Sequence, residues 1–238
     1  MEIRGGYTNY GQHIGVLMLD TAFPRLPGDI GNAASFDFAV KFKVVKGALP
    51  QLVNNKDPAE ALLPLFVKAA RELESEGVRA ITTSCGLLAS FQSELSAAVS
   101  VPVFTSTLML VPLCWQLTGT KKPVGIMTIR KSSLTDRQCR GAGWSQNDIP
   151  VCIMGMDSRK HFTEVYADNG KLLNLETLEG EVREASVKMM ADHPEIGSIV
   201  LECTNLAPFS QLIRQASGRP VFGMNDLLQF IHRCVAGF

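Results

Sequence analysis

Short apolar runs recur along the chain, and amphipathic stretches separate them. Runs of three to six apolar residues are typical of parallel strands covered on both faces. Residues 58–76 and 178–192 place their apolar side chains at helical spacing. This alternation predicts an α/β fold with parallel strands. The predicted strands are 14–19, 78–83, 101–104, 124–129, 151–154, 196–201 and 220–222.

The second half of the chain repeats the order of the first. Residues 78–85 are V-R-A-I-T-T-S-C and residues 197–203 are G-S-I-V-L-E-C, and each segment leads through a helical stretch to P-V-F. The distance from Cys85 to Pro102 is 17 residues, and so is the distance from Cys203 to Pro220. Upstream, I-G-V-L-M at 14–18 matches V-G-I-M-T at 124–128. We interpret this as an internal duplication.

The duplication places Cys85 and Cys203 at equivalent positions. Each cysteine follows the carboxyl end of a predicted strand, where open α/β sheets bind ligands, and each precedes a helix. Amide groups and the dipole at a helix start lower a thiol pKa and attract anions. If the two halves pack about a pseudo-twofold axis, the two thiols flank one cleft.

The other four cysteines have no metal-binding or CxxC spacing, and the four histidines are scattered. We expect Cys114 and Cys234 to be core residues because they lie in apolar helical patterns. We expect Cys152 to be a core residue on a strand and Cys139 to lie on the surface of a helix. We therefore predict no metal site.

Composition narrows the possible partners. The chain has 238 residues with 23 basic and 23 acidic side chains, and no basic stripe that would suit nucleic acid or an anionic membrane. It has no apolar run of about 20 residues, and its first residues do not resemble a signal peptide. We expect a cytoplasmic protein with a small-molecule substrate. Neither a G-x-G-x-x-G nor a Walker motif is present.

The two cysteine segments also resemble known motifs. T-T-S-C-G at 82–86 and E-C-T-N at 202–205 are similar to the paired cysteine motifs of the aspartate/glutamate/hydantoin racemase superfamily. F-P-R-L-P-G-D-I-G-N at 23–32 resembles a branch known only as aspartate/glutamate racemase family. The resemblance implies two α/β domains related by a pseudo-twofold, with the active site between them. It also implies that the C-terminal piece returns to the first half, which gives domains of 1–118 plus 209–238 and of 119–208.

The resemblance implies roles for particular residues. One thiolate of the pair Cys85 and Cys203 removes the Cα proton, and the opposite thiol returns a proton from the other face. No cofactor takes part. Thr128 and Thr204 match positions near the substrate, and Asp20 partly matches an acidic loop. Relatives are often dimers or larger, which implies a homo-oligomer.

Two departures argue against glutamate as the substrate. Gly86-Leu87 stands where glutamate racemases have Asn-Thr, and Asn205 stands where they have His. We expect a neutral cradle of hydroxyl and backbone N–H donors that needs no arginine to hold a carboxylate. The loop 23–32 is expected to form a lid or a substrate wall. The predicted substrate-binding residues are Asp20, Thr83, Ser84, Gly86, Thr128, Thr204 and Asn205.

Three functions remain open at this stage. The first is a cofactor-independent racemase or epimerase that acts on a small carboxylate, an amino acid or a hydantoin-like compound. The second is a decarboxylase or cis–trans isomerase of the same superfamily, in which one or both cysteines act. The third is a non-catalytic carboxylate sensor. Cysteines at matching positions favour the first, because decarboxylation needs only one proton donor.

Overall fold

The computed structural model describes residues 5–53 and 60–236, and it contains two parallel sheets with the same strand order. The first sheet has the order β2-β1-β3-β4 and the second has the order β6-β5-β7-β8. The α/β fold and the internal duplication are therefore confirmed. The strands are β1 (Ile14–Leu19), β2 (Val40–Val45), β3 (Ala80–Thr83), β4 (Val103–Phe104), β5 (Val124–Thr128), β6 (Val151–Gly155), β7 (Ser198–Leu201) and β8 (Val221–Phe222).

The strand register explains why the two cysteines are equivalent. Ile14 pairs with Ala80 in the first sheet, and Val124 pairs with Ser198 in the second. Cys85 lies two residues beyond the end of β3, and Cys203 lies two residues beyond the end of β7. The duplicated pattern thus places both thiols at the same level, beyond the carboxyl ends of central strands.

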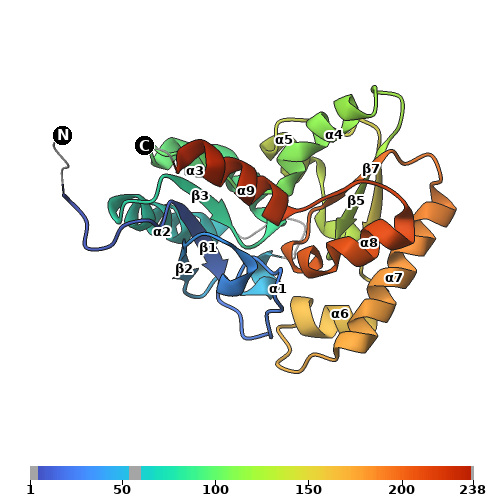
Figure 1. The fold of residues 1–238 in the computed structure, drawn as a ribbon, viewed down its shortest axis with the longest axis horizontal. Coiled ribbons are helices and arrows are strands. Elements are labelled where there is room, and N and C mark those ends of the chain that lie inside the picture. The colour runs from blue at the N-terminus through green and yellow to red at the C-terminus, as the bar shows by residue number, and fades with distance from the viewer. Residues whose placement is uncertain (1–4, 54–59, 237–238) are drawn as a thin grey trace.

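Helices cover both sheets, and the two halves lie side by side (Figure 1). The longest helices, α2 and α7, begin near the positions that the apolar spacing predicts. Residues 58 and 59, at the start of the predicted helix 58–76, lie outside the described residues. The α-helices are α1 (Pro50–Val53), α2 (Leu63–Ser75), α3 (Gln92–Ala98), α4 (Val111–Leu117), α5 (Asp136–Gly141), α6 (Lys160–Phe162), α7 (Leu175–Asp192), α8 (Ser210–Ser217) and α9 (Met224–Val235). Shorter helices are η1 (Ala33–Ser35), η2 (Glu60–Leu62), η3 (Gly86–Phe91), η4 (Thr107–Leu110), η5 (Lys131–Ser133), η6 (Thr163–Ala167) and η7 (Thr204–Phe209).

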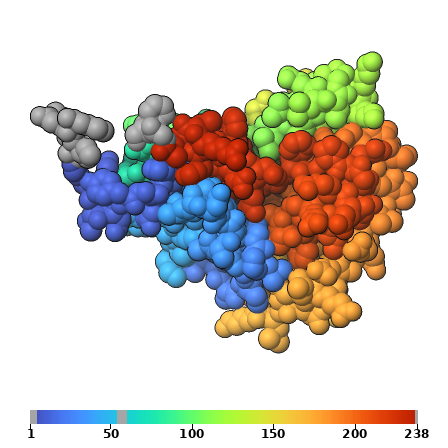
Figure 2. Space-filling model, in the orientation of Figure 1, coloured from blue at the N-terminus to red at the C-terminus, as the bar shows by residue number. Residues whose placement is uncertain are grey.

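The halves exchange one helix each. In α4, which follows the first sheet, Val111 and Cys114 pack in one cluster with Ile126 of the second sheet. In α9, which follows the second sheet, Leu227 and Leu228 pack with residues of β1. Figure 2 shows the C-terminal segment, in red, spanning both halves on this face.

This exchange corrects the expected domain boundary. We expected the return to the first half to begin near residue 209, but α8 packs on α7 and β8 pairs with β7. Only α9 returns. β8 pairs with β7 and so belongs to the second sheet. The chain therefore crosses back to the first half only after β8.

Other expectations also need correction. Cys139 is fully buried rather than on the surface, because α5 packs against η3. Cys234 is exposed near the end of α9, and Cys152 is only partly buried because β6 is an edge strand. Cys114 is buried as expected. β2 was not predicted, since lysines interrupt its apolar residues.

Within the described ranges, no helix has both the length and the apolar character that crossing a bilayer requires.

Candidate active site

A pocket lies beyond the carboxyl ends of the central strands and receives residues from both halves. Counted with its open mouth it holds about 390 Å³ of empty space. Both Cys85 and Cys203 line it, as the duplication predicted. Its lining residues are Leu19, Thr21, Phe23, Arg25, Pro50, Ser84, Cys85, Gly86, Ile129, Tyr166, Glu202, Cys203, Thr204 and Asn205.

Cys85 precedes η3 and is partly buried. Burial and the nearby carboxylate of Glu202 raise the pKa of its thiol to about 12, against the lowering effect of the backbone N–H groups of Leu87 and Leu88. The helix start therefore acts in the expected direction, but burial outweighs it. Cys85 is therefore a thiol at neutral pH.

Cys203 precedes η7 and is 7% exposed. Burial and Glu202 raise the pKa of its thiol well above the usual range, while the backbone N–H of Asn205 lowers it. The thiol donates to Oδ1 of Asn205 at 3.8 Å. The backbone N–H groups at both helix starts lower the thiol pKa values as predicted, but the net shift is upward because desolvation of the thiolate dominates.

Glu202 is a pocket residue that the sequence analysis did not select. Its side chain is buried, and burial raises the pKa of the carboxyl to about 7 although Thr128 donates a hydrogen bond of 2.6 Å to Oε2. Glu202 is the main charge that disfavours ionisation of each thiol, after burial. An acidic residue directly before a cysteine at the end of a buried strand was the signal for it.

Four of the predicted substrate-binding residues line the pocket: Ser84, Gly86, Thr204 and Asn205. The hydroxyl of Ser84 accepts a hydrogen bond from the backbone N–H of Leu19, and the hydroxyl of Thr204 donates 2.7 Å to the carbonyl of Ser84. The second of these bonds joins the two cysteine segments. A side chain at position 86 would collide with Glu202, so this close approach requires glycine.

The other three predicted residues lie outside the pocket lining. The hydroxyl of Thr83 donates to backbone carbonyls, including that of Thr105, and so ties neighbouring strand ends. Thr128 supports Glu202 from behind. Asp20 accepts a hydrogen bond from the backbone N–H of Gly47 and pairs with Lys46, so it shapes a neighbouring loop.

The loop 23–32 was expected to form a lid or a substrate wall, and it forms one wall of the pocket. Arg25 pairs with the buried Asp29, whose other oxygen accepts a hydrogen bond of 2.8 Å from the amide of Asn205. Among the described residues that line the pocket, Arg25 is the only lysine or arginine. The neutral cradle expected from the sequence needs no arginine, and nothing in the local pattern shows that this loop folds against the second cysteine segment.

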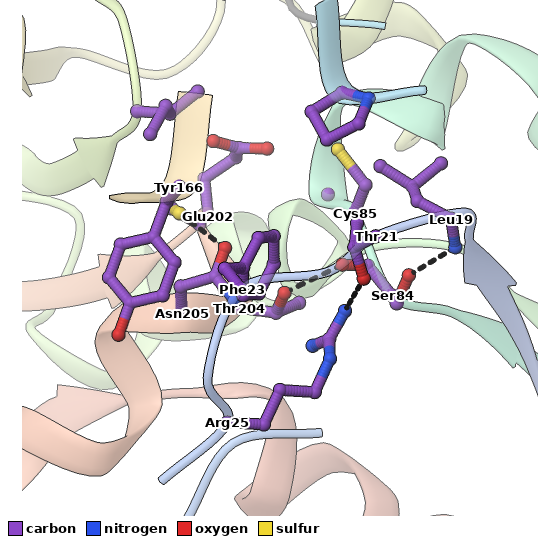
Figure 3. Close-up of a pocket in the computed structure, with 14 residues that line it drawn as sticks. Leu19, Thr21, Phe23, Arg25, Ser84, Cys85, Tyr166, Glu202, Thr204 and Asn205 are labelled. Carbon is purple, nitrogen blue, oxygen red and sulfur yellow. Dashed lines mark hydrogen bonds between the residues drawn. The ribbon is translucent and has the colours of Figure 1, made fainter. Parts of the chain in front are cut away.

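Two aromatic rings complete this wall. Phe23 meets Tyr166 edge to face with 5.1 Å between ring centroids, and the guanidinium of Arg25 lies 4.6 Å from the centroid of Phe23. Figure 3 shows Phe23, Tyr166 and Glu202 on one side of the pocket and Cys85 on the other. Tyr166 comes from η6 in the second half, so the aromatic pair bridges the halves.

Solved structures with this architecture include racemases and a decarboxylase. A double mutant of arylmalonate decarboxylase in a liganded form is 15% identical, with a TM-score of 0.57 over 94% of this chain and 92% of that one. Glutamate racemase from Bacillus anthracis is 14% identical, with a TM-score of 0.59 over 94% of this chain and 82% of that one. The chain therefore has the fold of these racemases and of this decarboxylase, which is the fold that the resemblance implied.

Comparison with known protein sequences points to a narrower group of relatives than the fold does. No protein-family model matches the chain. A dimethylsulfoniopropionate lyase of Durusdinium sp. clade D is 30% identical over 213 residues, which cover 88% of this chain and 70% of the lyase. Dimethylsulfoniopropionate lyase 3 of Emiliania huxleyi is 27% identical over 88% of this chain, but the match spans only 56% of that protein. The chain belongs to the family of the Durusdinium lyase.

Proposed function

We propose that this chain is a lyase that removes the α proton of a small carboxylate and expels a leaving group from the β carbon, with dimethylsulfoniopropionate as the substrate. The observation that carries the proposal is one pocket that combines two cysteine thiols with a buried carboxylate, one arginine and two aromatic rings. The 30% identity to a dimethylsulfoniopropionate lyase supports this choice of substrate.

The charges of the pocket suit a substrate with one negative and one positive end. Arg25 is held by Asp29 and offers a planar cation to the substrate carboxylate. Tyr166 presents a ring surface of the kind that binds onium groups, and the carboxylate of Glu202 lines the same pocket. We therefore assign the carboxylate end to Arg25 and the sulfonium end to the aromatic side.

The thiol must lose its proton before it acts as a base. Burial and Glu202 raise the pKa of both thiols, and a sulfonium cation bound in the pocket would stabilise negative charge there and so lower the pKa of a neighbouring thiol. Glu202, with a pKa raised to about 7, is suited to accept the thiol proton near neutral pH.

The elimination itself then balances without another reactant. The thiolate takes the α proton, and the electron pair of that C–H bond forms a double bond between the α and β carbons. The bond from the β carbon to sulfur breaks, and its electron pair leaves with sulfur as dimethyl sulfide. Acrylate remains, and Arg25 with the backbone N–H groups near the cysteines meets the charge that develops on the carboxylate.

The test is release of dimethyl sulfide from dimethylsulfoniopropionate, measured in the headspace, with acrylate measured in solution. The Cys85→Ser and Cys203→Ser variants are compared with Cys234→Ser, which changes an exposed cysteine outside the pocket. We expect the wild type and Cys234→Ser each to release dimethyl sulfide and acrylate in equal molar amounts. At least one pocket variant is expected to lose on the order of 10³-fold in rate, because the general base is gone.

Two results would overturn the proposal: no dimethyl sulfide from the wild-type protein, or wild-type rates from both pocket variants.

Racemisation is the second candidate, and the equivalence of Cys85 and Cys203 about the two sheets favours it. In this reaction one thiol removes the proton and the other returns one to the opposite face. Incubation in D₂O with amino acids, hydantoins and substituted malonates separates the candidates. Deuterium at Cα with loss of optical activity supports racemisation, and loss of carbon dioxide from malonates supports decarboxylation. Binding without turnover of any compound supports the sensor.

A further inference from the structure

We propose that Cys152, His193 and Glu195 form a binding site for one zinc-like divalent metal ion, away from the pocket. Cys152 is the second residue of β6, and His193 and Glu195 lie in the connection between α7 and β7. One ligand atom from each residue lies within 4.8 Å of the other two. Sulfur, imidazole and carboxylate together are a donor set that zinc prefers.

The spacing of these atoms fits a tetrahedral ion. Bonds of about 2.3 Å to sulfur and about 2.0–2.1 Å to nitrogen and oxygen place sulfur and oxygen about 3.5 Å apart and nitrogen and oxygen about 3.3 Å apart. In the structure, Sγ of Cys152 is 3.8 Å from Oε1 of Glu195, and Nδ1 of His193 is 3.4 Å from the same oxygen. These two distances lie within a few tenths of an ångström of the ideal values, and the three ligand atoms all lie within 4.8 Å of one another.

The backbone around these ligands is already fixed. The backbone N–H of Ile196 donates to the carbonyl of His193, which closes the turn that carries His193 and Glu195. Arg219 donates a hydrogen bond of 2.9 Å to the carbonyl of Pro194 between them. The metal therefore meets a formed loop rather than one it must order.

The exposure of the three residues defines the kind of site. Cys152 is partly buried, whereas the side chains of His193 and Glu195 are 43% and 53% exposed. Three protein ligands leave a fourth position for water on the solvent side. Cys152 lies near the amino end of its strand, whereas the pocket lies beyond the carboxyl ends, so the two sites are separate. The metal would fasten β6 to the end of α7.

The sequence spacing concealed this site. Cys152 and His193 are 41 residues apart, which matches no common zinc-ligand spacing, and only the pairing of β6 and β7 with β5 brings them together.

The experiment measures metal binding to the whole protein by isothermal titration with Zn²⁺ and by the absorption of bound Co²⁺. We expect one Zn²⁺ per chain and a thiolate-to-cobalt absorption band. The Cys152→Ser and His193→Ala variants are expected to lose the band and to bind Zn²⁺ at least tenfold more weakly, while Cys234→Ser and the double variant Cys85→Ser/Cys203→Ser keep both signals. Zn²⁺ should raise the thermal unfolding temperature of the wild type but not that of Cys152→Ser.

Metal binding that survives in Cys152→Ser, or that is lost in Cys85→Ser/Cys203→Ser instead, would overturn the proposal. So would the absence of any Co²⁺ band in the wild type. Because no readout depends on turnover, failure here leaves the lyase proposal untouched, and failure of the lyase test leaves this one untouched.

Discussion

Glu202 combines two features that rarely occur together in a carboxylate: full burial, and a place in the wall of a pocket beside two thiols. A hydrogen bond from Thr128 offsets only part of the cost of its burial, so its pKa is raised to about 7. At neutral pH this side chain exchanges a proton easily. It is the residue through which pH acts on both the fold and the site.

The raised pKa of Glu202 predicts how stability varies with pH. In the unfolded chain the carboxyl ionises above its ordinary value of 4.5, while in the folded protein it stays protonated up to about 7. The unfolded state thus binds fewer protons between these values, and the free energy of unfolding falls as pH rises through this window, by about 3 kcal/mol in total from this group.

Urea denaturation at pH 5 and pH 8 measures this effect. The Glu202→Gln variant should lose that part of the pH dependence, whereas Glu179→Gln, at an exposed position on α7, should keep it. An unchanged difference between the two pH values in Glu202→Gln would contradict the prediction.

Arg25 is expected to control affinity for the substrate carboxylate. The Arg25→Gln variant keeps hydrogen-bonding groups but loses the charge, so KM for dimethylsulfoniopropionate should rise about 10-fold or more, since a charge-assisted hydrogen bond contributes about 1.5–3 kcal/mol. Steady-state kinetics of headspace dimethyl sulfide measure this. Arg183→Gln, on the exposed side of α7, is the control. Equal KM values in both variants would remove Arg25 from the binding site.

At the scale of elements, α4 and α9 do more than cover a sheet, because each helix also joins the two halves. Each helix begins after the last strand of one half and packs on the sheet of the other. The apolar cluster beneath each helix therefore contains residues from both halves. Any change in such a cluster acts on both halves together.

Truncation of Leu228 tests this. Leu228 is fully buried in the cluster that α9 shares with β1, whereas Phe230 on the same helix is 64% exposed. The Leu228→Ala variant should lose about 2–5 kcal/mol of unfolding free energy, because a cavity opens in the shared core. Phe230→Ala should change it by about 0.5 kcal/mol or less. A single cooperative transition is expected in denaturant, and two separated transitions in Leu228→Ala would show that the halves unfold independently.

At the scale of the whole molecule, the sequence predicted what depends on local pattern. Apolar runs located seven of the strands, and the equal 17-residue spacings brought Cys85 and Cys203 to one pocket. β2 was not predicted because Lys41 and Lys43 interrupt its apolar residues. In the fold these lysines pair with acidic side chains, among them Glu76 of the first half.

What the sequence did not predict depends on contacts between distant segments. An amphipathic pattern shows which face of α9 is buried, but not which sheet it covers. The positions of Arg25 and Tyr166 in the pocket follow from a loop of one half meeting a helix of the other. The thiol pKa values depend on how deeply the assembled pocket excludes water, which no local motif encodes.

The exchanged helix α9 also bears on the order of events during synthesis. The first sheet is complete in the chain after β4, yet part of its cover is made about 120 residues later. Until α9 has been synthesised, the residues of β1 that it covers lack this partner. The core that α9 shares with β1 therefore forms only after α9 has been synthesised.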